Sequence, residues 1–106
     1  AGPCMAESKA LCEDVAGTMK ELCSELGLPY VFKASYDKAN RTSVGSERGL
    51  GMEAGLEILN GISASMGLPT TTDIHLPDQA APVAEVVDIL QIPAFLCRQS
   101  DMLEAA

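Results

Sequence analysis

The apolar positions along the chain first predict two long helices. Residues 5–26 carry apolar side chains at steps of three and four, which is the spacing of one helical face. These side chains are Leu11, Val15, Met19, Leu22 and Leu26. Ser8 can cap a slightly later start, and Gly27 can end the helix in a left-handed conformation. A second helix is predicted over residues 52–66, with Gly67 at its end.

Between and after these helices, short apolar runs predict strands. Residues 28–35 are almost continuously apolar, as is typical of a parallel strand that is covered on both faces. The tripeptide Gly-Leu-Pro recurs 40 residues later and leads into a second strand over residues 68–74. A shorter helix over residues 78–87, with Val83, Val86 and Val87 inward, and a third strand over residues 88–92 complete the repeat. Ser100 is expected to cap a last helix, and residues 1–4 resemble the end of an earlier strand.

Regular alternation of strands and helices predicts an α/β protein with a parallel sheet. A doubly wound sheet would carry a G-x-G-x-x-G loop after a strand, and the chain has none. A barrel places its chemistry at the carboxyl ends of the strands, which is where the polar residues fall here. We therefore predict a parallel (β/α)8 TIM barrel, of which residues 1–106 form about the first half. This partial barrel would run from the end of strand 1 through the start of helix 4.

Composition narrows the classes of partner. The chain has 106 residues and a formal net charge of -8, which fits one domain and argues against nucleic acids and anionic membranes. No apolar run approaches the roughly 20 residues of a membrane span, and no export signal opens the chain. The four cysteines match no zinc motif, so reduced thiols in a cytoplasmic protein are the simplest expectation.

One segment, residues 30–43, is locally cationic within this acidic chain. It contains Lys33, Lys38 and Arg41, and Lys33 lies in a predicted buried strand. Burying an ammonium group is costly unless an anion meets it, so this segment is a candidate anion site. Arg41, Thr42 and Ser43 would suit a phosphate. The alternatives are a solvated loop for Lys38 and a lysine at position 33 that extends to solvent.

Four further positions are candidates for chemistry. Asp73 and His75 stand at alternate positions after a strand, so they face the same side and could orient hydroxyls or move protons. An ordinary structural histidine is an equally good interpretation of His75. Cys4 could pack in the core or bind a metal. Gln91 lies in a predicted buried strand and requires hydrogen-bond partners from a ligand or the backbone.

Four segments together resemble the 3-deoxy-D-manno-octulosonate 8-phosphate synthase family. They are AGPC at residues 1–4, VFKASYDKANRTS at 31–43, TDIH at 72–75 and QIPAFLCRQSD at 91–101. The resemblance covers essentially the whole chain in one register. The related 3-deoxy-D-arabino-heptulosonate 7-phosphate synthases share the AGPC opening and differ in the central segment. The chain departs from the usual family residues at Gly45, Glu47, Leu50 and Leu76.

The resemblance implies a TIM barrel, a homotetramer at full length, that condenses phosphoenolpyruvate with D-arabinose 5-phosphate and water. It implies that Lys33 and Lys38 contact phosphoenolpyruvate and the reacting centre. It assigns the sugar phosphate to a set of three residues, which are Asn40, Arg41 and Thr42. Asp73 would bind sugar hydroxyls, and Lys38, Asp73 and His75 are the candidate catalytic residues.

Further residues complete the implied site. Gln91, Pro93 and Ala94 would line the phosphoenolpyruvate pocket, and Arg98 would reach a phosphate in a neighbouring subunit. Family members with Cys at the position of Cys4 are the metal-dependent ones, so the resemblance implies a divalent metal ion. The alternatives are a heptulosonate synthase and a non-catalytic half-barrel that binds phosphate-bearing ligands or self-associates. We expect the chain alone to be inactive.

Overall fold

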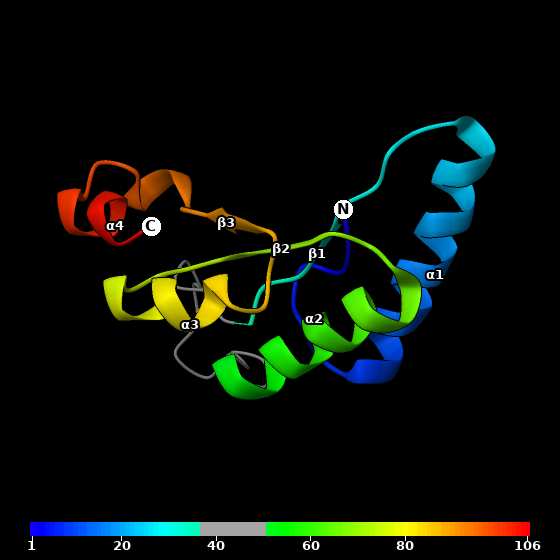
Figure 1. The fold of residues 1–106 in the computed structure, drawn as a ribbon, viewed down its shortest axis with the longest axis horizontal. Coiled ribbons are helices and arrows are strands. Elements are labelled where there is room, and N and C mark those ends of the chain that lie inside the picture. Colours follow the sequence, from blue (N-terminus) through cyan, green and yellow to red (C-terminus); the bar gives the residue numbers. More distant parts are fainter. Residues whose placement is uncertain (37–50) are drawn as a thin grey trace.

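The computed structural model describes residues 1–36 and 51–106, and Figure 1 shows their arrangement. In chain order, the elements are α1 (Lys9–Leu26), β1 (Phe32–Lys33), α2 (Met52–Met66), β2 (Thr70–Asp73), the 3-10 helix η1 (Pro77–Gln79), α3 (Ala80–Ala84), β3 (Ile89–Gln91), the 3-10 helix η2 (Ala94–Leu96) and α4 (Ser100–Ala105). The predicted alternation of helices and strands is therefore confirmed for these residues.

The strands form a parallel sheet in the order β1-β2-β3. The first residues extend this sheet on the free side of β1, because Met5 pairs with Ser35 in a parallel bridge and the Ala6 N–H donates to the Ser35 carbonyl over 2.8 Å. The first residues therefore lie beside β1 in a parallel arrangement. Three parallel strands with helices establish the α/β class.

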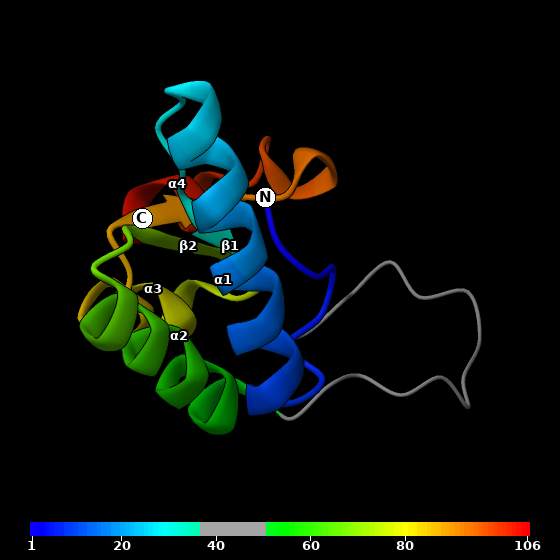
Figure 2. The same ribbon diagram turned by 90° about the vertical axis from the view of Figure 1, so that its right-hand side faces the viewer.

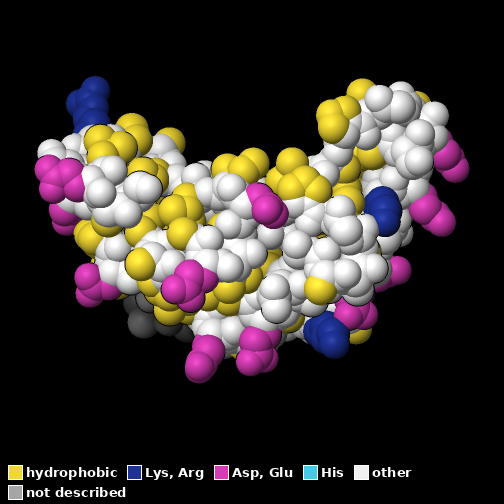
Figure 3. Space-filling view, viewed as in Figure 1, with side chains coloured by type: hydrophobic (Ala, Val, Ile, Leu, Met, Phe, Trp, Pro, Cys, Tyr) yellow, Lys and Arg dark blue, Asp and Glu magenta, His cyan; other side chains and the backbone are white. Residues whose placement is uncertain are grey.

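Helices cover one face of this sheet. Figures 1 and 2 show α2 and α3 along one side of the strands, with α1 against α2. Alternate strand residues point into the core that these helices close, and each is at most 1% exposed. They are Phe32, Ala34, Thr70, Thr72 and Ile74. The opposite face, which we call the open face, is hollowed and carries gathered hydrophobic side chains between the α4 end and the end of α1 (Figure 3).

The helix boundaries follow from their caps. Helix α1 begins at Lys9 because the Ser8 hydroxyl accepts a hydrogen bond from the Leu11 N–H over 3.1 Å, which confirms the later start. Gly27 and Gly67 end α1 and α2 with φ of 68° and 64°, as predicted. The prediction that Ser100 caps the last helix was wrong. Ser100 is the first residue of α4, and the capping position is taken by Gln99, whose side chain makes no capping hydrogen bond.

The predicted apolar face of α1 is partly wrong. The fully buried side chains are Cys12 and Ala16, whereas Leu22 and Leu26 are 47% and 72% exposed. Small side chains face the core because α1 packs closely against α2. Burial also raises the pKa of the Cys12 thiol, with smaller contributions from Glu7 and Glu13, as is typical of a thiol packed in a core.

The strands and the third helix are shorter than their apolar runs. The ladder of β1 covers only Phe32–Lys33, because residues 28–31 form the connection from α1 and Pro29 cannot donate to a ladder. The helix expected over 78–87 is divided into η1 and α3, although Val83 and Val87 point inward as predicted. Across residues 1–36 and 51–106, no helix has the length and hydropathy that crossing a bilayer requires.

Candidate functional site

The sheet register gathers polar side chains on the open face. Lys33 pairs with Thr71, and Asp73 pairs with Gln91. Two residues beyond Lys33, Ser35 continues the same register and meets Asp73 across the strands. Because side chains alternate along a strand, Lys33, Ser35, Asp73 and Gln91 all point away from the helices. The face that these helices leave open is therefore the one that carries the chemistry.

Asp73 is the centre of this group. Its side chain is 5% exposed, and the Ser35 hydroxyl donates a hydrogen bond to Oδ1. The Lys33 Nζ lies 4.0 Å from Oδ1, and the His75 Nε2 lies 3.5 Å from Oδ2. A buried carboxylate is tolerated when donors and cations surround it, as they do here. The prediction that Asp73 and His75 face the same side is confirmed.

His75 is held by the turn that follows β2. Its own N–H donates to the Gln79 Oε1 over 2.8 Å, and the Leu76 N–H donates to the same oxygen over 3.1 Å. The imidazole is 8% exposed, and its Nδ1 is buried without a hydrogen-bond partner among the described residues. A buried ring nitrogen that lacks a partner is a place where a ligand hydroxyl or a water can bind. His75 therefore belongs to the polar cluster and is not an isolated core residue.

The position of Lys33 shows which anion within the chain lies near its ammonium group. Its side chain is 31% exposed, and the nearby anion is Asp73. At 4.0 Å this contact is an ion pair rather than a hydrogen bond, so the donors of the ammonium group are not used by Asp73. Lys33 can therefore bind a second anion.

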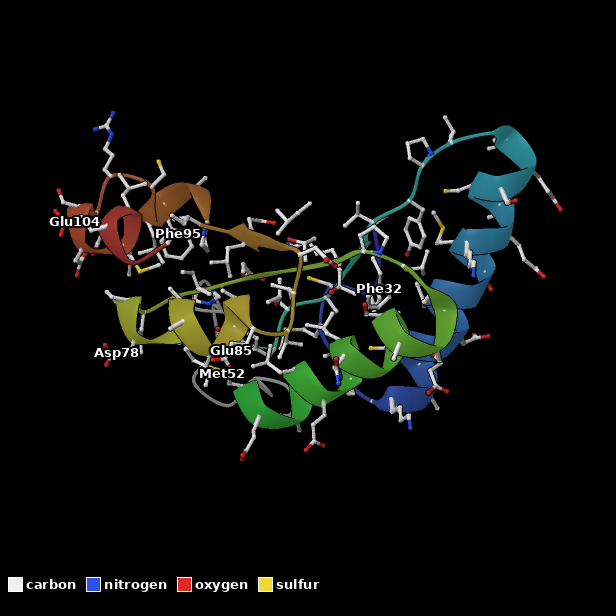
Figure 4. All side chains as sticks on the ribbon, viewed as in Figure 1. Phe32, Met52, Asp78, Glu85, Phe95 and Glu104 are labelled. Atoms are coloured by element: carbon white, nitrogen blue, oxygen red, sulfur yellow. The ribbon has the colours of Figure 1, made fainter. Side chains whose placement is uncertain are left out.

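A pocket of about 250 Å³ opens over this cluster. It is lined by Lys33, Asp73, His75, Gln91, Pro93, Ala94 and Phe95. Charged groups form one part of the wall, and the segment that begins η2 forms the apolar part; Figure 4 labels Phe95 there. Six residues predicted for the site thus meet in one pocket. The ammonium group of Lys33 in its wall suits a small anionic ligand.

A second pocket, of about 300 Å³, lies on the helix side. It is lined by Lys9, Ala54, Glu57, Ile58 and Gly61, which belong to α1 and α2. Lys9 is also 3.8 Å from Glu13 on its own helix. This pocket shares no residue with the Asp73 cluster.

The remaining predicted residues have different outcomes. Gln91 is exposed rather than buried, because β3 is the outer strand of the described sheet and its side chain faces the pocket. Arg98 is exposed and does not line the pocket. Cys4 is exposed, and its carbonyl accepts the Ser35 N–H over 3.2 Å, so it stands beside the cluster. Residues 37–50 lie outside the described residues, and with them the predictions for Lys38, Asn40, Arg41 and Thr42.

Sequence reasoning missed Ser35. The residue is 0% exposed and contacts the central carboxylate directly. A signal was present, because Ser35 stands two residues after Lys33 and shares its face of the strand. A small hydroxyl in an apolar run needs a buried partner, and here that partner is Asp73.

The chain is similar to known proteins over its whole length. The sequence model of the DAHP synthetase I family matches residues 1–106. A protein of Granulibacter bethesdensis is 61% identical over the whole chain, and one of Dechloromonas aromatica is 58% identical over 99% of it. One of a Synechococcus species is 57% identical over 99%. Each is named 2-dehydro-3-deoxyphosphooctonate aldolase, and the chain spans 37–38% of their lengths.

Proposed function

The chain belongs to the DAHP synthetase I family, and on this premise we propose that it forms part of the active site of a synthase that joins phosphoenolpyruvate to D-arabinose 5-phosphate. Its relatives carry the name 2-dehydro-3-deoxyphosphooctonate aldolase. The observation that carries the proposal is the pocket in which Lys33, Asp73 and His75 meet. The parallel strands would belong to a (β/α)8 barrel, whose chemistry lies at the carboxyl ends of its strands.

The reaction makes and breaks a defined set of bonds. The alkene carbon of phosphoenolpyruvate forms a carbon–carbon bond with the aldehyde carbon of the sugar. Water adds to the neighbouring carbon, and the bond from that carbon to the phosphate oxygen breaks. Inorganic phosphate leaves together with the eight-carbon sugar acid phosphate. The site must therefore hold two phosphates and a carboxylate and must manage a proton at the aldehyde oxygen.

The described residues supply several of these needs. The unused donors of Lys33 would bind an anionic group of phosphoenolpyruvate, and Gln91 with Pro93 and Ala94 would line the same pocket. Asp73 would accept hydrogen bonds from sugar hydroxyls. His75, whose Nδ1 has no partner among the described residues, would orient a hydroxyl or hold a proton beside it.

The remaining predicted residues also have roles in the proposal. Lys38 would act at the reacting centre, and the sugar phosphate would bind a set of three residues, Asn40, Arg41 and Thr42. Arg98 would serve a neighbouring subunit in a homo-oligomer, which we expect to be a tetramer. These roles rest on the family resemblance.

We also propose that Cys4 is one ligand of a divalent metal ion. The thiol is exposed, and the Cys4 carbonyl accepts from Ser35, which contacts Asp73, so Cys4 fits as one ligand. Among residues 1–36 and 51–106, no group of three or more His, Cys, Asp or Glu side chains could hold a metal ion, so the other ligands would come from elsewhere. A bound ion would polarise an oxygen atom of the substrate.

The test uses a chimeric protein and a phosphate-release assay. Residues 1–106 replace the matching segment of the Granulibacter relative, and phosphate is measured with phosphoenolpyruvate and arabinose 5-phosphate. We expect turnover that requires the sugar phosphate. Asp73→Asn should lower kcat by about 100-fold or more, as loss of a group at the reacting centre does. Glu57→Gln, in the helix-side pocket, should have no effect.

A second candidate follows from the name of the family model itself. A heptulosonate synthase would use erythrose 4-phosphate in place of arabinose 5-phosphate, and the same chimera distinguishes the two sugars. Turnover with erythrose 4-phosphate alone would replace the first proposal. Full activity in Asp73→Asn would remove the Asp73 cluster from the mechanism.

A further inference from the structure

Ser35 holds the central carboxylate of the site from a neighbouring strand. The residue lies two positions after β1 and is 0% exposed, and its Oγ donates a hydrogen bond to the Asp73 Oδ1 at the end of β2. We propose that Ser35 is a positioning residue, which fixes the rotation of the Asp73 carboxylate and so determines which of its oxygens faces His75 and the pocket.

The two oxygens of Asp73 have different neighbours. Oδ1 receives the Ser35 hydroxyl and lies 4.0 Å from the Lys33 Nζ. Oδ2 lies 3.5 Å from the His75 Nε2. Rotation about the Cβ–Cγ bond of an aspartate is intrinsically broad. The directional bond from Ser35 selects one orientation, and Oδ2 is then the oxygen that can accept from a ligand.

The backbone of Ser35 is held in place on both sides by hydrogen bonds. Its own N–H donates to the Cys4 carbonyl over 3.2 Å, and its carbonyl accepts from the Ala6 N–H over 2.8 Å. The backbone is therefore fixed by the first residues of the chain, and the hydroxyl is carried on a rigid strand. Ser35 is fully buried and does not line the pocket.

The arrangement differs from a nucleophilic triad. There, a histidine accepts the serine proton and a carboxylate supports the histidine. Here the serine hydroxyl is bonded to the carboxylate, and the His75 Nε2 faces the other carboxylate oxygen. Ser35 acts through Asp73, not on a substrate.

The chain contains one matched control for Ser35. Thr72 is equally buried, and its Oγ1 donates to the Ala34 carbonyl over 2.7 Å, which also joins the β2 segment to the β1 segment. Its side chain points to the helix side of the sheet. Ser35→Ala and Thr72→Val each remove one buried hydroxyl between these strands, and only the first loses a contact with Asp73.

The experiment records nitrogen-15 spectra of the histidine ring in the 106-residue chain. His75 is the single histidine of the sequence, so its ring signals need no assignment. We expect Ser35→Ala to move both ring nitrogen signals and Thr72→Val to leave them in place. Ser35→Cys, which keeps the volume and a weak donor, should move them less, and it decides the question if the alanine variant does not fold. Ring signals at the wild-type positions in the alanine or cysteine variant, or equal shifts in Thr72→Val, would overturn the proposal.

A second arm concerns ligands and rests on the proposed function. The chain is titrated with phosphoenolpyruvate and then with arabinose 5-phosphate, with ring signals as the readout. We expect Ser35→Ala to bind arabinose 5-phosphate about fivefold to tenfold more weakly, the effect of one lost hydrogen bond. If neither compound binds to the wild-type chain, the ligand-free spectra still decide the role of Ser35, and the phosphate-release assay of the chimera decides the proposed function separately.

Discussion

At the scale of single residues, the close contact between Gly55 and Tyr36 leads to a prediction about stability. A Cβ atom added at Gly55 would lie 2.5 Å from the Tyr36 Cβ, and Tyr36 is 1% exposed. Alanine favours a helix by about 1 kcal/mol over glycine, but a clash in a packed core costs about 1–3 kcal/mol. We therefore expect Gly55→Ala to lower the free energy of unfolding, measured by urea denaturation.

The same helix provides the control for Gly55. Gly61 also lies in α2, and a Cβ there would meet nothing within 4 Å. Gly61→Ala should therefore leave stability unchanged or raise it by up to about 1 kcal/mol. A Gly55→Ala chain that is as stable as the Gly61→Ala chain would contradict the packing of Tyr36 against α2.

Residue spacing predicted much of the site, and the limits of that prediction are physical. Alternation along β2 and the turn after it was sufficient to place Asp73 and His75 on one side. It was insufficient for Gln91, because exposure depends on which strand lies at the edge. Ser35 was missed because a serine in an apolar run becomes informative only when the partner across the strands is known.

At the scale of elements, the cap of α1 is open to a direct test. The Ser8 hydroxyl accepts from the Leu11 N–H, which would otherwise lack a partner in the first turn. We expect Ser8→Ala to lower the free energy of unfolding by about 1 kcal/mol. Ser24→Ala, near the other end of the same helix and exposed, should be neutral or slightly stabilising. If both variants changed the free energy of unfolding equally, the Ser8 hydroxyl would not be capping α1.

Element boundaries were predictable where a local signal determines them. Gly27 and Gly67 end their helices with positive φ, which depends on the glycine itself. The burial of α1 was harder to predict, because Leu22 and Leu26 fit the periodicity as well as Cys12 and Ala16 do. Which of two helical stripes is buried depends on how closely the neighbouring α2 approaches, and that is a property of the tertiary structure.

At the scale of the whole molecule, the open face carries both the proposed site and an apolar surface on which another polypeptide could pack. The pocket of Lys33, Asp73 and His75 lies at the carboxyl end of this face, and hydrophobic side chains gather over its hollow (Figure 3). Ile89, whose partner is Thr71, is on the same face of the sheet and is 51% exposed. Exposed apolar surface of this kind favours pairing with another polypeptide.

This surface predicts that the 106-residue chain self-associates at micromolar concentrations, as measured by sedimentation velocity. Ile89→Lys places a charge on the open face and should shift the chain toward the monomer, because burying that charge would be costly. Ala64→Lys adds the same charge at an exposed position of α2 and should leave the association unchanged, which controls for net charge. A wild-type chain that sediments as a monomer would contradict pairing, and an equal response to both lysines would assign the association to general charge rather than to the open face.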